Sequence, residues 1–166
     1  MRLPLPSFFF INMMTTDFSS AELRALTFPA RFESLDHVRN FVGRAAEECG
    51  LNTGAIYAVQ LAVDEACSNI IEHAFGGECS EDIQCVCEMG STSLTVTLRD
   101  CGKPFDPSQV PDPDLDAKLE DRSEGGLGLY FMRQLMDDVS FTFIPDVGGE
   151  EGCNILKMVK VKEPSE

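Results

Sequence analysis

Hydrophobic residues recur at helical spacing in two consecutive stretches of the chain. Residues 34–49 carry an apolar side chain at about every third or fourth position, and Gly50 follows. A second stretch begins at Asn52 or Thr53 and keeps a similar stripe to about Phe75, before a pair of glycines. Such spacing, with a polar start and a glycine end, is typical of amphipathic helices. We therefore predict two helices, each with one face in the core.

Shorter segments of partly alternating polarity predict strands. They are residues 25–32, 82–89, 93–99, 139–144 and 154–162. A proline in the first favours the edge of a sheet, and Gly90-Ser91-Thr92 predicts a hairpin between the second and third. Residues 126–136 again have helical spacing. This order predicts an α+β fold: a two-layer α/β sandwich whose mixed, mostly antiparallel sheet is covered on one face by helices.

The length of 166 residues fits one domain. We assign it to residues 23–162, between a leader of residues 1–22 that we expect to be disordered and a tail of residues 163–166. The first part of the leader, residues 1–14, contains two prolines and is too short to cross a membrane as a helix. Residues 103–124 lose periodicity and collect prolines and acids, which is typical of a functional lid or of a disordered connector.

The chain is strongly acidic, with 28 acidic against 13 basic residues and a net charge of −15. This charge repels phosphate backbones and anionic lipids, so it argues against direct binding to nucleic acid or membrane. It favours a basic protein partner, although acidity can also serve solubility alone.

Seven cysteines are scattered along the chain without a Cys-x-x-Cys pair. An odd number at irregular spacing favours reduced thiols in the cytoplasm over a disulfide framework. Cys85 and Cys87 share one face of a predicted strand, where they could hold a soft metal. Small buried hydrophobic residues are their commoner role.

Glu65 and Asn69 lie one turn apart on one face of the second predicted helix. The Asn side chain offers a neutral oxygen to Mg²⁺, and the Glu carboxylate could accept a proton from an attacking hydroxyl. The alternative is a solvated helix face. His73 follows on the same face, where we expect a structural hydrogen-bonding residue rather than a ligand.

Two further segments suit a nucleotide. Asp100-Cys101-Gly102 ends a predicted strand, where the carboxylate can accept a hydrogen bond from adenine and the glycine lets a flat base approach. A plain turn is the alternative. Gly125-Gly126-Leu127-Gly128 opens a predicted helix, whose free N–H groups and dipole favour phosphate, unless it is only a hinge. The lysine of a P-loop is missing.

Taken together, these segments resemble the anti-sigma factor serine/threonine kinases of bacteria, within the GHKL superfamily of ATPases that includes histidine kinases and gyrase. The matching motifs are residues 63–75, 99–106 and 125–132, and the likeness extends over about residues 26–161. One position departs from the family pattern, because Cys153 and Asn154 follow Gly152 where a threonine near the adenine is usual.

The resemblance implies a Bergerat-type ATP-binding fold and a cytoplasmic kinase that uses ATP and Mg²⁺. Such a protein binds a sigma factor, phosphorylates a Ser or Thr of an antagonist protein, and forms a homodimer. Carried over by position, Glu65 is the general base, Asn69 the Mg²⁺ ligand and Asp100 the adenine contact. The remaining site residues are Gly102, Arg122, Gly125, Gly126, Leu127 and Gly128, with the arginine neutralising phosphate charge.

Two alternatives remain at this point. In the first, the chain is an ATP-sensing module that captures a partner without transferring phosphate, although a sensor has no need of Glu65. In the second, it is a solitary relative of the histidine-kinase catalytic domain. We recognise no phosphoacceptor-histidine helix before the domain, which disfavours the second.

Overall fold

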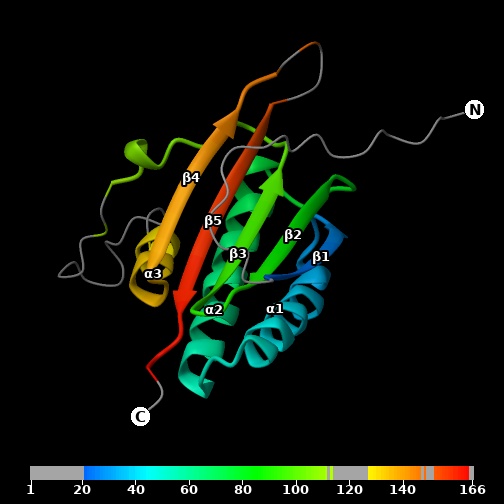
Figure 1. Ribbon diagram of the computed structural model, residues 1–166. Helices are drawn as coiled ribbons and strands as arrows, with labels where there is room; N and C mark the ends of the chain where they lie inside the picture. The colour runs from blue at the N-terminus through cyan, green and yellow to red at the C-terminus, as the bar shows by residue number, and fades with distance from the viewer. Residues whose placement is uncertain (1–20, 112, 114–126, 147, 149–151, 165–166) are drawn as a thin grey trace, which may run out of the picture.

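The computed structural model describes residues 21–111, 113, 127–146, 148 and 152–164. Its five-stranded sheet has the order β1-β2-β3-β5-β4, and each pairing among the described strands is antiparallel. The strands are β1 (Glu22–Pro29), β2 (Asp82–Met89), β3 (Ser93–Asp100), β4 (Asp138–Ile144) and β5 (Cys153–Val161). Helices α1 (Leu35–Cys49), α2 (Thr53–Asn69) and α3 (Leu127–Leu135) cover one face (Figure 1). The predicted α+β sandwich is confirmed.

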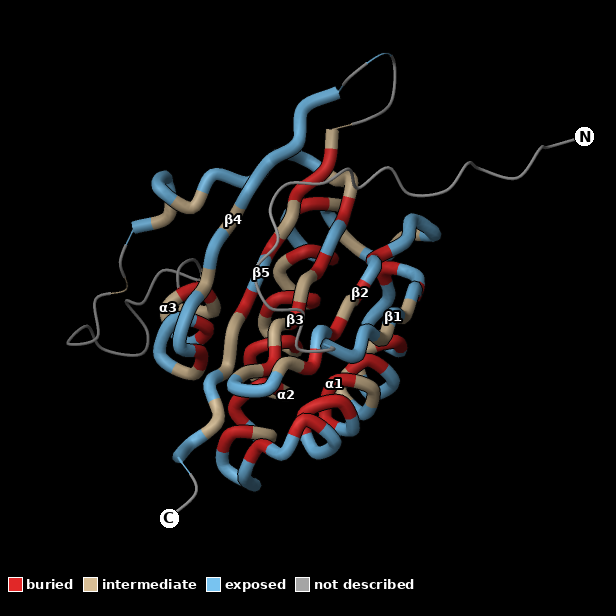
Figure 2. Tube along the Cα trace, in the orientation of Figure 1, coloured by how far each residue is buried: buried red, intermediate tan, exposed pale blue. Residues whose placement is uncertain are grey.

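The core lies between this sheet and the helices. Alternate residues of β2 and β3 are buried, while the intervening ones are more exposed on the open face of the sheet (Figure 2). Cys85 and Cys87 belong to the buried set and lie under the helices. Among the described residues no cluster of three or more His, Cys, Asp or Glu side chains could hold a metal ion. These two cysteines therefore act as small core residues.

The first strand is shifted toward the N-terminus relative to the prediction. It ends at Pro29, and Phe32 begins a 3₁₀ turn (Phe32–Ser34) rather than lying in the strand. Ser34 Oγ donates to the carbonyl of Pro29 at 2.9 Å, which turns the chain into α1. β1 is an edge strand, as its proline predicted, because an edge position tolerates the missing N–H.

The second helix changes type after Asn69. The prediction of one helix to Phe75 is corrected by a π-helical segment, η2 (Ile70–Ala74), in which the Phe75 N–H donates to Ile70 O at 3.0 Å. A π-turn adds one residue to a turn and is frequent at functional sites. One extra residue in a turn hardly changes the spacing of hydrophobic residues, so the sequence pattern did not predict the π-helical segment.

The hairpin between β2 and β3 is confirmed, with the Gly90 N–H donating to Ser93 O at 2.9 Å. In the part of the chain that the structure describes, no helix is long and apolar enough to cross a membrane.

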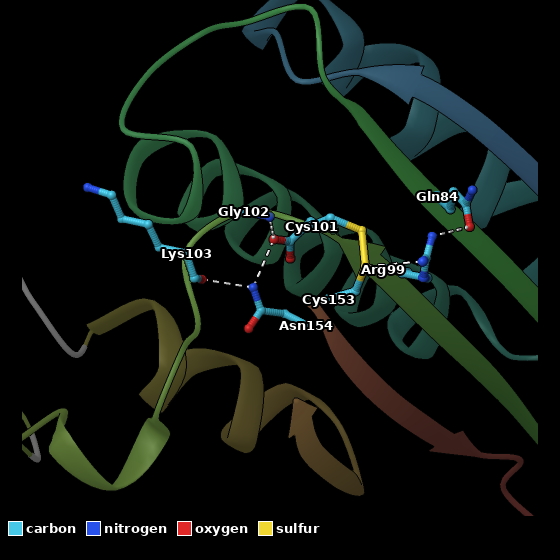
Figure 3. The surroundings of a disulfide bond; sticks show 8 residues. Gln84, Arg99, Cys101, Gly102, Lys103, Cys153 and Asn154 are labelled. Atoms are coloured by element: carbon cyan, nitrogen blue, oxygen red, sulfur yellow. Dashed lines mark hydrogen bonds between the residues drawn. A yellow bond between two sulfur atoms is a disulfide. The ribbon is translucent and has the colours of Figure 1, made fainter. Parts of the chain in front are cut away.

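One disulfide joins the end of β3 to the start of β5 (Figure 3). It pairs Cys101 with Cys153, so the prediction of reduced thiols throughout is wrong for these two. The other five cysteines are free. The partners are 52 residues apart in sequence and meet because β3 and β5 pair, with Asp100 opposite Asn154. No local spacing could signal such a contact.

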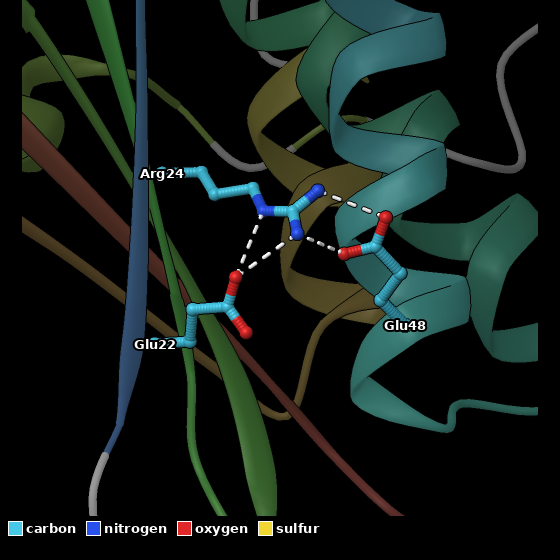
Figure 4. Close-up of polar contacts among 3 residues, drawn as sticks. All are labelled: Glu22, Arg24 and Glu48. Carbon is cyan, nitrogen blue, oxygen red and sulfur yellow. Dashed lines mark hydrogen bonds and ion pairs between the residues drawn. The ribbon is translucent and has the colours of Figure 1, made fainter.

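Among the described residues, one ion pair joins the helices α1 and α2, and another joins β1 to α1. Arg39 of α1 places Nε and Nη2 each 2.6 Å from Asp64 Oδ2 of α2. The other oxygen, Asp64 Oδ1, is buried and has no hydrogen-bond partner among the described residues. Burial raises the pKa of Asp64, and Arg39 opposes that rise. At the surface, Arg24 of β1 reaches Glu48 of α1 (Figure 4).

We predict that Arg39→Ala lowers the free energy of unfolding by about 1 to 2 kcal/mol, because it leaves the half-buried Asp64 carboxylate without its cation. Arg24→Ala is the control, since it breaks only a solvent-exposed pair and should cost clearly less. Urea denaturation of both variants measures the difference. Equal losses would show that Asp64 gains nothing from Arg39.

Candidate functional site

A cavity of about 350 Å³ opens between α2–η2, the segment after β3, α3 and the β4–β5 pair. Its wall is mostly apolar, and a few polar side chains enter it. The apolar lining includes Ala66, Ile70, Leu129, Met132, Phe141 and Leu156; the polar lining includes Asn69, His73, Asp100, Lys103 and Asn154. This size and composition are typical of a small-molecule site.

Asp100 is the one acidic residue in the described lining, and it is buried, with 4% of its surface exposed. Its Oδ1 accepts the Gly102 N–H at 3.0 Å and Asn154 Nδ2 at 2.9 Å (Figure 3). Both bonds from described residues end on this one oxygen. The second oxygen, Oδ2, is therefore left to accept a hydrogen bond from a ligand in the cavity.

Asn154 organises this end of the cavity. Its amide nitrogen also donates to the Lys103 carbonyl at 2.9 Å, and its oxygen accepts the Phe105 N–H at 2.9 Å. The sequence flagged this position only because a threonine is usual there in the family it resembles. In the structure the Asn side chain links β5 to the Asp100 carboxylate and to the segment that follows β3. It is the main site residue that sequence reasoning did not assign.

The ionisation of Asp100 reflects a balance of burial and hydrogen bonding. Burial raises the pKa of this carboxyl, while the bonds from Asn154 and Gly102 and the nearby Arg99 charge lower it. Among the causes that lower this pKa, the hydrogen bond from Asn154 is the largest. The Asn side chain thus helps to keep the carboxylate charged.

Gly102 shapes the cavity from outside its lining. A Cβ at this position would lie 2.6 Å from the Ala74 carbonyl oxygen and 2.7 Å from its carbon. The next residue, Lys103, donates its N–H to the same oxygen at 2.8 Å. The glycine therefore brings the chain after β3 against the end of η2, where the sequence had predicted room for a base.

Gly128, in the first turn of α3, lies against the predicted pair on α2. A Cβ here would lie 2.9 Å from Asn69 Nδ2 and 3.1 Å from Glu65 Oε2. The structure thus gathers Glu65, Asn69 and Gly128 at one place. Asn69 and Gly128 line the cavity, and Glu65 lies beside it. The first-turn N–H groups of a helix have no partner within the helix, which suits an anion there.

The remaining residues named from the sequence have different outcomes. Arg122, Gly125 and Gly126 lie outside the described residues, and Leu127 begins α3 without lining the cavity. His73 lines the cavity with an exposed side chain, 4.0 Å from Glu72, so it makes no buried structural hydrogen bond among the described residues.

The first part of the predicted lid is part of the site. Pro104, Phe105, Gln109 and Val110 line the cavity, and the ring centroid of Phe105 is 5.0 Å from that of Phe141 on β4. Asp106 caps the short η3 (Pro107–Gln109) by accepting the Ser108 N–H at 3.0 Å. Residues 103–111 therefore form one wall of the cavity.

The structure thus places a buried carboxylate with one open oxygen, an Asn–Glu pair and Gly128 of the first turn of α3 in or beside one apolar cavity. Residues 28–160 match the model of the histidine kinase-like ATPase domain, and the chain belongs to that family. It is also 31% identical over 132 residues to proteins named serine-protein kinase RsbW from Bacillus cereus and Bacillus anthracis. The match covers 77% of this chain and 78% of each relative.

We predict that Gly128→Ala weakens ATP binding about tenfold or more, because the new Cβ displaces the ends of Glu65 and Asn69. Alanine favours helix over glycine, so thermal stability should hold or rise. Calorimetry of ATP with Mg²⁺ provides the test. Gly54→Ala is the control, since its Cβ would meet only Asn52 Oδ1 at an ordinary 3.5 Å. Unchanged affinity in Gly128→Ala would contradict the prediction.

A second prediction concerns pH. Asn154→Ala removes a bond that favours ionised Asp100, so it raises the pKa of this carboxyl further. ATP affinity should fall as the pH is lowered in both proteins, and the fall should begin at a higher pH in the variant. Titration calorimetry at a series of pH values measures this. Asp100→Asn cannot take up the proton and should remove this component; identical profiles for wild type and Asn154→Ala would refute the assignment.

Proposed function

We propose that this protein is an ATP- and Mg²⁺-dependent serine/threonine protein kinase of the anti-sigma factor type. It binds a sigma factor and phosphorylates a Ser or Thr of the antagonist protein that competes for it. The observation that carries the proposal is the meeting of Glu65 and Asn69 at Gly128, beside a cavity that holds the buried Asp100. The likeness to relatives named serine-protein kinases supports the same class.

Each residue has a distinct proposed task. Asp100 Oδ2 accepts a hydrogen bond from the adenine amine while Asn154 and Gly102 hold Oδ1. The first turn of α3 faces the phosphates with its free N–H groups. Asn69 is the metal ligand, and Mg²⁺, when bound, neutralises the developing phosphate charge.

Glu65 is the proposed general base. As the substrate hydroxyl oxygen attacks the γ-phosphorus, the carboxylate takes the hydroxyl proton, and the bond from phosphorus to the bridging oxygen of ADP breaks. Glu65 lies one helical turn from the metal ligand Asn69, so the two tasks fall on one face of α2. We also place Arg122, Gly125, Gly126 and Leu127 with the phosphates, and we propose a cytoplasmic homodimer.

The alternative is an ATP-sensing module that captures a partner without transferring phosphate. One observation favours it: Glu65 is not among the residues that line the cavity. A carboxylate that never reaches the substrate hydroxyl would serve only as a neighbour of Gly128. The two functions differ in whether Glu65 is needed for transfer.

The test uses two variants with different expected losses. Glu65→Gln keeps the shape but accepts no proton, so ATP and partner binding should survive while phosphate transfer falls by about 10²- to 10⁴-fold. Asn69→Ala removes the metal ligand, so Mg²⁺-dependent ATP affinity and transfer should fall together. The immobilised protein is used to capture partners in the presence of ATP and of ADP, and mass spectrometry identifies them. The captured partner then serves as the substrate in assays with radiolabelled ATP.

Full transfer activity in Glu65→Gln would remove the general-base role. No transfer by wild type with a verified partner and ATP present would favour the sensor. Recovery of neither a sigma factor nor a small antagonist would contradict the proposed partners.

A further inference from the structure

We propose that the Cys101–Cys153 disulfide is a reversible exchange site for low-molecular-weight thiols, and that its state sets the nucleotide affinity of the cavity. The second half of this inference rests on the proposed function. Cys101 directly follows Asp100, and Cys153 directly precedes Asn154. The bond therefore ties together the two chain segments that hold the adenine-facing carboxylate (Figure 3).

The two sulfurs are not equivalent. Cys153 is buried, with 4% of its surface exposed, whereas Cys101 is partly exposed. Arg99 Nη2 donates to Cys153 Sγ at 3.1 Å, and Gln84 holds the other end of the guanidinium at 3.5 Å from Nη1. A neighbouring cation stabilises a thiolate. Cys153 is therefore the better leaving group and Cys101 the sulfur that is open to attack.

This difference between the two sulfurs determines the order of the steps in reduction. A glutathione thiolate attacks Cys101 Sγ, the S–S bond breaks, and Cys153 leaves as a thiolate beside Arg99. A second glutathione thiolate then attacks the glutathione sulfur of the mixed disulfide and releases the Cys101 thiolate, which takes up a proton. The products are the Cys101 thiol, the Cys153 thiolate beside Arg99 and one glutathione disulfide. Oxidation is the reverse, with glutathione disulfide as the oxidant.

The remaining cysteines do not compete with this pair. Cys49, Cys67, Cys85 and Cys87 are buried, and burial raises the pKa of the Cys67 thiol well above its usual value. Burial limits access to these thiols, and the raised pKa leaves little thiolate at Cys67. Cys79 is half-exposed but has no disulfide partner. Disulfides of cytoplasmic proteins are commonly transient and redox-sensing, which agrees with the proposed location.

The disulfide affects ATP affinity by restraining the two chain segments that it joins. In the oxidised protein the end of β3 and the start of β5 are covalently joined, so Asp100 and Asn154 keep the geometry that leaves Asp100 Oδ2 open. In the reduced protein only the hydrogen bonds remain. Ordering these groups must then accompany binding, and ATP affinity should fall by about threefold to tenfold.

The experiment equilibrates the purified protein in glutathione buffers of increasing reduced fraction. Alkylation and mass spectrometry measure the thiols of Cys101 and Cys153, and calorimetry measures ATP affinity in each state. We expect the disulfide to open within the buffer series and affinity to fall with it. Cys101→Ser should hold the lower affinity in every buffer, whereas Cys79→Ser should respond as wild type does. Arg99→Gln should slow reduction several-fold.

Two results would overturn the inference. Thiols that never appear at Cys101 and Cys153 in reduced glutathione would remove reversible exchange. Equal ATP affinity in the oxidised and reduced proteins would remove the effect on the cavity while leaving the nucleotide site intact. Absence of ATP binding in both states would instead refute the proposed function, and the alkylation pattern would still report the chemistry of the disulfide.

Discussion

The site depends on how closely two separate segments can approach one helix. Gly102 lies against the Ala74 backbone and Gly128 against the side chains of Glu65 and Asn69, so any Cβ at either position would enter occupied space. Both contacts are made to the continuous α2–η2 element. This element therefore fixes the distance between the Asp100 end of the cavity and the Asn69 end. We therefore expect both ends of a nucleotide in this cavity to contact groups that this one helical element positions.

The buried carboxylate adds a second constraint. A charged group in an apolar wall is costly unless hydrogen bonds replace water. Gly102 and Asn154 supply two such bonds to Asp100 Oδ1 and leave Oδ2 to the ligand. An acceptor fixed in this way loses little freedom when a ligand binds, which lowers the cost of binding in a preorganised site. The hydrogen bonding of Asp100 thus depends on the pairing of β3 with β5.

Local signals in the sequence were enough for most of the fold. The apolar stripe of α2 and the turn at residues 90–92 each lie within one short segment, and both appear in the structure where the pattern placed them. Glu65 and Asn69 were placed together on one face of α2 for the same reason, since one helical turn separates them. The contact of Gly128 with Glu65 and Asn69 was not foreseen, because it joins segments that lie far apart in the sequence.

What the sequence did not reveal depends on contacts between distant segments. Asn154 reaches Asp100 across 54 positions, and Cys101 finds Cys153 across 52. Both follow from the register of β3 against β5, which alternating polarity does not specify. The π-turn of η2 was missed for another reason, because one extra residue in a turn hardly alters a hydrophobic stripe.

The most direct test of this account is a crystal structure with Mg²⁺ and a non-hydrolysable ATP analogue. We expect the adenine amine on Asp100 Oδ2, the metal on the Asn69 side-chain oxygen, and the phosphates at the first turn of α3. A nucleotide bound elsewhere, or bound in this cavity with its base away from Asp100, would contradict the central claim that β3, β5 and α2 together build an adenine site.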